Sequence, residues 1–337
     1  MKLKIFIVNI LFSIMLLTSS DVFAQQNVQF SQYVFNSLTI NPAYTGYKED
    51  LYLNAVYRKQ YVSFPGSPST AAISMDGLLN KEKKSIGLGG HLTVDKLGPQ
   101  ETISLFGTYS YRIRFDEDDT KRLCLGLAAG FNQYSLDGSA LQYVDANDPS
   151  INSAKQSVIK PDAQVGAFYY SSKFYAGLSV LNLFALYDNG SVYLNNTNAS
   201  TTENITTHLY FTLGGLVTMS DNVKLKPSIM LKEDFHGPSS LDLNLLALLS
   251  EKLWVGASYR SAVTLWHKKA VASELSKSGA ASLMAELFAT DKLRIGYSYD
   301  FITSGLSSYQ GGSHEISVGL LFNKNGDAER IKSPRYF

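Results

Sequence analysis

The stretch "KLRIGYSYDF", residues 292–301, determines the fold class because its side chains alternate between two chemistries. Apolar and aromatic side chains occupy one face, and charged, polar or small residues occupy the other. The first set is Leu293, Ile295, Tyr297, Tyr299 and Phe301, and the second is Lys292, Arg294, Gly296, Ser298 and Asp300. Alternation with period 2 indicates a β-strand that has two different faces. A strand of about ten residues is also long enough to cross a bilayer when tilted.

The same alternation recurs along the chain and predicts fourteen strands. Their predicted bounds are 51–62, 69–79, 85–96, 101–115, 121–136, 161–171, 173–182, 207–219, 222–233, 240–249, 252–261, 279–288, 292–302 and 312–323. Tyr and Phe recur near the strand ends, as in the aromatic girdles of outer-membrane barrels. We therefore predict an all-β fold, a 14-stranded antiparallel transmembrane β-barrel over residues 51–323. A soluble β-sandwich also alternates and is the alternative fold.

The connections between the predicted strands favour the barrel. After even-numbered strands they are short, as in "DEDDTK" (116–121) and "SDN" (220–222). After odd-numbered strands they are longer, as at 137–160, 183–206 and 262–278. Outer-membrane barrels have short periplasmic turns and long outer loops. The sequence therefore predicts an outer-membrane location, with the lipid bilayer around the barrel and the short turns in the periplasm.

Charged side chains in the predicted strands fall on the face opposite the apolar one. They are Arg58, Arg112, Arg114, Lys224, Lys226, Arg260, Arg294, Asp76, Asp242, Asp300, Glu286 and Glu315. A basic side chain facing lipid near the bilayer midplane would cost about 2–4 kcal/mol. We expect these side chains to face the lumen and to form ion pairs on its wall. A selective pore lining is the alternative.

The first residues have the features of an export signal. A short basic start precedes an apolar run at 5–17, and the small or aliphatic residues Val22 and Ala24 suit signal peptidase. We predict a signal peptide over 1–24 that is cleaved before Gln25. An uncleaved anchor is the alternative, although the run is short for a membrane-spanning helix.

The composition gives no support for nucleic-acid binding or for enzyme chemistry. Removing residues 1–24 takes two Lys and one Asp from 30 basic and 29 acidic residues, which leaves 28 of each. The single cysteine, Cys124, excludes an intramolecular disulfide framework. No two histidines have metal-ligand spacing, and no Gly-x-Ser-x-Gly elbow or phosphate-binding loop is present. We expect no catalytic residues, cofactor or metal, with an outer-membrane enzyme of the Ser/His type as an alternative.

The segment between the signal peptide and the first strand, residues 25–50, does not alternate. Within "QFSQYVFNSLTINPAYTG" (29–46), the spacing of Phe30, Tyr33, Val34 and Leu38 places them on one face of a short helix. We predict a helical or irregular segment that packs at the periplasmic mouth or in the lumen, where it closes the pore and offers a surface to partners. The candidate residues are Gln29, Phe30, Gln32, Tyr33, Phe35, Asn36, Asn41, Pro42, Tyr44 and Gly46. A loosely ordered linker is the alternative.

Several stretches together resemble one protein family. They are "QFSQYVFNSLTINPAYTGY" (29–47), "YRKQYVSFPGSPST" (57–70), "LKPSIMLK" (225–232), "GGSHEISVGLLF" (311–322) and the terminal "SPRYF" (333–337). In order and spacing they resemble the PorP/SprF family of outer-membrane proteins of the type IX secretion system of Bacteroidetes. Tyr61 is a mild departure, because another aromatic such as Trp is expected there.

The resemblance implies a non-enzymatic accessory barrel of the type IX secretion system. The implied partners are periplasmic ring or linker proteins, the translocon and a secreted cargo protein, with gliding-motility adhesins among the possible cargoes. No small-molecule substrate is expected. An outer-membrane porin or small-solute transporter is the alternative function.

The C-terminal residues 324–337 are predicted to form a periplasmic tail. Pro334 blocks extension of a strand or helix, so the last residues should lie outside the barrel. Pro334, Arg335, Tyr336 and Phe337 are therefore candidate residues of a short docking peptide. The alternative is that Phe337 serves as an assembly signal.

Overall fold

A computed structural model describes residues 28–80, 82–140, 154–187, 191–193, 201–263, 265, 279–303 and 311–322. The predicted signal peptide and the predicted C-terminal tail, with Pro334, Arg335, Tyr336 and Phe337, lie outside the described residues.

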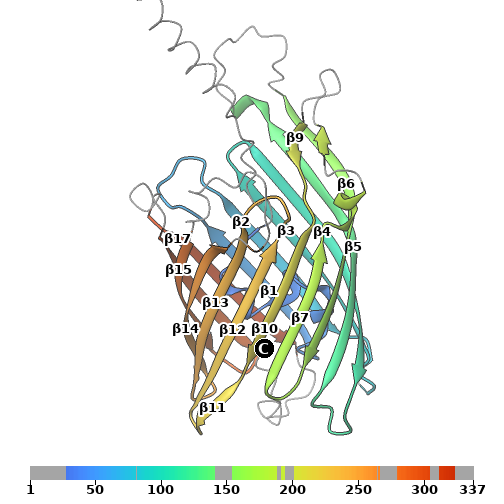
Figure 1. Ribbon diagram of the computed structural model, residues 1–337, viewed down its shortest axis with the longest axis vertical. Helices are drawn as coiled ribbons and strands as arrows, with labels where there is room; N and C mark the ends of the chain where they lie inside the picture. The colour runs from blue at the N-terminus through green and yellow to red at the C-terminus, as the bar shows by residue number, and fades with distance from the viewer. Residues whose placement is uncertain are drawn as a thin grey trace, which may run out of the picture.

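The described chain forms a closed antiparallel barrel (Figure 1). Its strands are β1 (Leu51–Lys59), β2 (Ser69–Leu78), β3 (Ile86–Leu97), β4 (Gln100–Arg114), β5 (Arg122–Asp137), β6 (Lys155–Tyr170), β7 (Phe174–Leu181), β10 (His208–Gly215), β11 (Val217–Ser220), β12 (Val223–Glu233), β13 (Ser239–Leu249), β14 (Leu253–Val263), β15 (Gly279–Phe288), β16 (Leu293–Ile302) and β17 (Ser313–Phe322). Each strand pairs with the next in this order, except that β10 and β11 do not pair with one another and both pair with β12. Strand β1 pairs with β17 to close the sheet.

The predicted number of strands is confirmed. The sheet has fifteen segments, but β10 and β11 both pair with β12 and are two parts of one strand interrupted at Leu216, which leaves fourteen. Most predicted bounds lie within a few residues of the observed ones. The main difference is β6, which begins at Lys155 instead of residue 161. A small hairpin of β8 (Ser191–Tyr193) and β9 (Thr201–Asn204), inside the predicted 183–206 connection, was not predicted.

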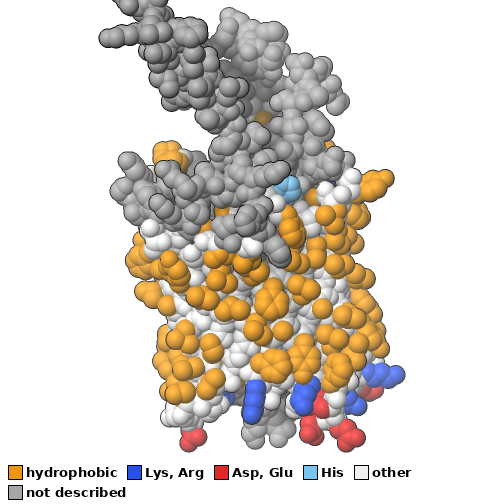
Figure 2. Space-filling view, viewed as in Figure 1, with side chains coloured by type: hydrophobic (Ala, Val, Ile, Leu, Met, Phe, Trp, Pro, Cys, Tyr) orange, Lys and Arg blue, Asp and Glu red, His pale blue; other side chains and the backbone are white. Residues whose placement is uncertain are grey.

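The two faces of the barrel wall have the chemistry that the alternation predicts. Large apolar side chains point outward along every long strand, and they cover the visible face in Figure 2. Lys, Arg, Asp and Glu side chains gather at the lower rim of that view, at the short turns. On the inner face, Arg58 pairs with Asp300 and Glu315, and Arg260 pairs with Asp242, as expected for a polar wall. Among the described residues, no helix is long and apolar enough to span a membrane.

A charge on the outer face should destabilise the barrel according to its depth. Leu283 lies outward in the middle of β15 and is 57% exposed, whereas Met219 lies outward near the short turns and is 63% exposed. We expect Leu283→Lys to lower the free energy of unfolding in lipid vesicles by about 2–4 kcal/mol and Met219→Lys by about 0–1 kcal/mol. Equal losses in urea titrations of the two variants would contradict a lipid-facing midplane at β15.

Candidate functional site

The lumen is occupied by the N-terminal part of the described chain. We name residues 28–50 the luminal segment. It consists of three short 3-10 turns, η1 (Gln32–Val34), η2 (Ser37–Thr39) and η3 (Pro42–Tyr44), joined by irregular backbone. Most of its side chains are buried against the inner wall, and Leu38 and Thr45 have no exposed surface.

The short helix predicted for this segment is broken into turns by asparagine side chains. Asn36 accepts a hydrogen bond from Leu38 N at 3.4 Å, and Asn41 accepts one from Ala43 N at 2.9 Å. An Asn side chain that bonds to the backbone two residues ahead competes with helix continuation. The two asparagines thus begin separate turns, and Phe30, Tyr33, Val34 and Leu38 are buried without forming the single helical face that the spacing predicted.

The luminal segment runs along the lumen from the long-loop end to the short-turn end. Gln29 accepts a hydrogen bond from Arg260, which lies near the long-loop end of β14. At the other end, Glu49 pairs at 2.9 Å with Lys84 in the short turn between β2 and β3. The segment then enters β1 at Leu51, on the short-turn side. Of the two positions that the sequence analysis offered, the periplasmic mouth and the lumen, the segment thus occupies the lumen along its length.

A buried charge cluster holds the start of the segment. Arg58 lies 2.5 Å from Asp300 and 2.9 Å from Glu315, and all three side chains are nearly fully buried. Ser31 N and Gln32 N donate to the Glu315 carboxylate at 2.8 and 2.9 Å. The Ser31 hydroxyl donates to Asp300 at 2.8 Å. Hydrogen bonds to ionised groups are among the stronger ones in proteins, so this cluster fixes the backbone of the segment to β1, β16 and β17.

Neutral hydrogen bonds continue along the segment. Asn36 Nδ2 donates to Asn54 at 3.1 Å and to Ser74 at 2.9 Å. On the opposite wall, Asn244 Nδ2 donates to Tyr33 Oη at 2.7 Å.

Further along, the segment bonds to strand backbones and to short side chains. Asn41 Nδ2 donates to the Ala167 carbonyl at 3.1 Å. The Ser110 hydroxyl donates to the Thr45 carbonyl at 2.6 Å. Gly46 N donates to Asp76 at 2.6 Å. The contacts of the segment thus reach strands around the whole circumference of the barrel.

Two apolar clusters fill the space between these polar contacts. In the first, Tyr33, Val34, Phe35 and Ile40 pack with wall residues that include Trp254. In the second, Leu38, Ala43, Tyr44 and Tyr47 pack with Cys124, Phe168, Tyr170 and Tyr175. The Tyr44 and Tyr47 rings stack at a centroid distance of 4.7 Å, and Tyr47 meets Tyr170 edge-on at 5.0 Å. Aromatic pairs of this geometry stabilise packing beyond their area burial.

Inward-facing glycines make room for the segment. A Cβ at Gly126 would clash with the backbone of Ala43, and one at Gly166 would clash with the side chain of Asn41. A Cβ at Gly87 would likewise clash with the Thr45 carbonyl, and one at Gly296 would clash with the Gln32 side chain. The wall is therefore shaped to the segment, and the strand pattern alone did not reveal this.

The structure brings ten of the candidate residues together, from Gln29 to Gly46, within the luminal segment. The sequence analysis missed Thr45, Tyr47 and Glu49, which also contact the wall. The sequence did contain a signal: glycines such as Gly126 and Gly166 occupy strand positions that face the lumen, and glycine there can indicate close approach of another backbone.

Comparison with known proteins now identifies the family. A family model described as "Type IX secretion system membrane protein PorP/SprF" matches residues 22–320. The chain belongs to the PorP/SprF family. It is thus an outer-membrane component of the type IX secretion system. A search among curated proteins gave no match for this PorP/SprF protein.

Solved structures similar to this PorP/SprF protein are outer-membrane barrels. The CymD monoaromatic hydrocarbon channel is similar with a TM-score of 0.51 and 11% identity, over 90% of this chain and 95% of that chain. A Pseudomonas aeruginosa FadL homologue has a TM-score of 0.44 and 14% identity, over 86% of this chain and 94% of that chain. At these identities the likeness to CymD concerns the fold alone.

A side chain at Gly126 should displace the luminal segment of the PorP/SprF barrel. We expect Gly126→Val to leave the barrel folded and to make residues 29–46 susceptible to protease, because the new Cβ takes the place of the Ala43 backbone. Gly107 on β4 is the matched control, since it faces outward and its nearest neighbour to a Cβ lies at 3.9 Å. Mass spectrometry of the cleaved barrels measures the difference. Equal protection of the segment in Gly126→Val and Gly107→Val would contradict the close packing.

Proposed function

We propose that this protein is a closed accessory barrel that acts by binding other secretion components and cargo, and not by catalysis or by conducting solutes. One observation carries the proposal: the luminal segment is buried and hydrogen-bonded to the wall from Gln29 to Gly46. A lumen occupied in this way leaves little room for an open aqueous path. Partners are therefore expected to bind at the ends of the barrel.

The short-turn end is the surface that we propose for periplasmic partners. Charged side chains gather there (Figure 2), and Glu117 and Asp118 are exposed in the turn between β4 and β5. The luminal segment reaches the same end, where Glu49 bonds to Lys84. A partner bound at this rim would contact both the turns and the end of the luminal segment. The tail residues Pro334, Arg335, Tyr336 and Phe337 are proposed as an additional docking peptide on this side.

Cargo is the second proposed partner. The family is part of a secretion system, and the strand ends that the long connections join lie at the end of the barrel opposite the charged turns. We propose that a secreted protein, with gliding-motility adhesins as one class, binds there during export or surface attachment. The alternative role as a porin or small-solute transporter draws on the channel-type fold, and the occupied lumen argues against it.

The orientation of the luminal segment can be tested by labelling. Val28 is partly exposed and precedes Gln29, which contacts Arg260 near the long-loop end. With the short turns in the periplasm, a membrane-impermeant maleimide added to intact cells should label Val28→Cys and should not label Lys83→Cys in a short turn. The native Cys124 is buried and should stay unlabelled. Labelling of Lys83→Cys alone would reverse the proposed orientation.

Partner binding can be tested by recovering the barrel from native outer membrane and identifying retained proteins by mass spectrometry. We expect type IX components to remain with the unaltered barrel, and fewer to remain when Glu117 and Asp118 are changed to Ser. Lys96→Ser, an exposed charge at the opposite end, is the matched control and should retain periplasmic partners. Steady ion conductance of the unaltered barrel in planar bilayers, with no secretion component retained, would overturn the proposal.

A further inference from the structure

The barrel wall is uneven where β6 meets β7. Strand β6 spans Lys155–Tyr170, but its pairing with β7 begins only at Val165, opposite Val180. Strand β7 ends at Leu181, which pairs with His208 at the start of β10. The long-loop half of β6 therefore continues past the end of its neighbour, and the wall needs another element beside it.

A short 3-10 turn, η5 (Leu183–Leu186), fills that position. Asn182 ends β7 with a left-handed backbone (φ 57°), and its side chain donates to the Thr206 carbonyl at 3.1 Å. The Phe184 N–H donates to Asp162 Oδ1 on β6 at 3.2 Å. These bonds hold η5 beside β6 without forming a continuous β-ladder.

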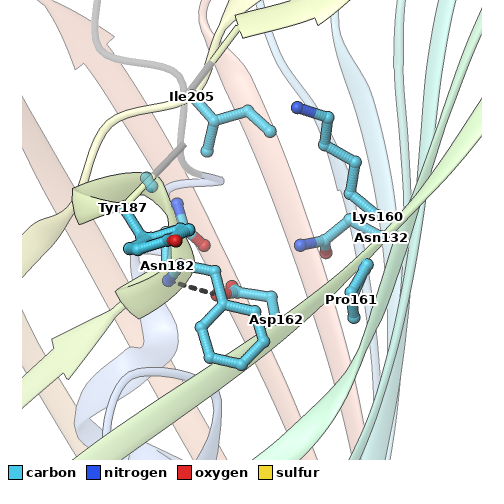
Figure 3. Close-up of a pocket in the computed structure, with 9 residues that line it drawn as sticks. Asn132, Lys160, Pro161, Asp162, Asn182, Tyr187 and Ile205 are labelled. Carbon is cyan, nitrogen blue, oxygen red and sulfur yellow. Dashed lines mark hydrogen bonds between the residues drawn. The ribbon is translucent and has the colours of Figure 1, made fainter. Parts of the chain in front are cut away.

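A cavity of about 510 Å³ lies between η5 and residues of β5 and β6 (Figure 3). Its apolar lining includes Pro161, Phe184, Tyr187 and Ile205. Its polar residues are Asn132, Lys160, Asp162 and Asn182, and the surface that the lining exposes is predominantly apolar. A volume of several hundred Å³ with apolar walls and a few polar groups is typical of small-molecule sites.

The polar group that stands out is Asp162. The residue is 6% exposed and lines the cavity. Its Oδ1 accepts the Phe184 N–H, whereas its buried Oδ2 accepts no hydrogen bond among the described residues, and the Asn132 side chain lies beside the carboxylate. A buried acceptor without a partner is costly, so a ligand that donates a hydrogen bond to Oδ2 would be favoured.

The position of the cavity indicates where the ligand comes from. Phe184 is 50% exposed and Tyr187 is 95% exposed, and Ile159 projects outward from β6 next to Pro161. The apolar side of the cavity thus adjoins the lipid-facing wall, near its long-loop edge, while Asp162 lies on the inner side. A molecule entering from the bilayer would present its chain to the aromatic side chains and its head group to the carboxylate.

We propose that this cavity binds a small single-chain amphiphile of the membrane with a hydroxyl head group. The hydrocarbon chain lies against Phe184, Tyr187 and Ile205, and the hydroxyl donates a hydrogen bond to Asp162 Oδ2. The site is separate from the luminal segment and does not depend on the role proposed for that segment.

The proposal can be tested with a tryptophan reporter. The Phe184→Trp barrel in lipid nanodiscs is titrated with 11-bromoundecan-1-ol, whose bromine quenches tryptophan on contact, and the titration of the unaltered barrel is subtracted. We expect saturable quenching. Leu178→Trp is the matched control, because Leu178 is a lipid-facing residue of β7 and is 47% exposed. It should show only quenching that rises in proportion to the bromoundecanol in the bilayer.

The role of Asp162 is tested in the same reporter. In Asp162→Asn, the amide oxygen can still accept the Phe184 N–H, but an NH₂ group stands in place of Oδ2 and cannot accept the ligand's hydroxyl. The affinity for bromoundecanol should therefore fall about tenfold. Bromoundecane, which lacks the hydroxyl, should bind the two forms equally weakly. Binding of radiolabelled undecanol to the unaltered barrel provides a readout without any substitution. Non-saturable quenching at both Trp positions together with no saturable undecanol binding, or an unchanged affinity in Asp162→Asn, would overturn the proposal.

Discussion

The constraint on which the rest of the structure depends is the width of the barrel. About eight strands give a barrel whose interior is just filled by wall side chains, and the diameter grows with the number of strands. Fourteen strands therefore leave a space that the wall alone cannot fill. The chain fills it with its own residues 28–50, and the polar inner face, the inward glycines and the two apolar clusters all match this segment.

Polar burial at the start of the segment is tolerated because the charges of this cluster share several partners. Removing one member of a buried ion pair typically costs about 3–5 kcal/mol, since the other charge is left uncompensated. Asp300 and Glu315 share Arg58 and also accept hydrogen bonds from Ser31 and Gln32. The segment thus supplies the hydrogen bonds that water would otherwise donate to these wall carboxylates. Removal of the segment would therefore leave buried wall carboxylates without these donors, just as removal of the wall groups would leave the segment's backbone N–H groups without acceptors.

The sequence predicts the wall far better than it predicts the interior. Period-2 alternation reports which face each strand residue occupies, so strand number and most bounds follow from it. It does not report what the inner face touches, because contacts such as Gln32 with Ser317 join residues far apart in the chain. Asn36 and Asn41 broke the helix predicted from the spacing of Tyr33 and its neighbours through local side-chain bonds that this periodicity ignores. The early start of β6 was missed as well: Pro161, where the predicted strand began, lies opposite Phe131 within the β5–β6 ladder, and the strand continues back to Lys155.

The same contacts determine how the barrel can open. Withdrawal of the luminal segment would leave several buried donors and acceptors without hydrogen-bond partners, each at a cost of about 1–3 kcal/mol. A ligand shifts such an equilibrium only by its difference in affinity for the two states. A change from mostly closed to mostly open needs a preference of about 5.5 kcal/mol. Only a partner that replaces many of the segment's hydrogen bonds can supply that preference. The ends of the segment, at Gln29 and Glu49, are the places where such replacement would begin, because their polar contacts lie nearest the two mouths.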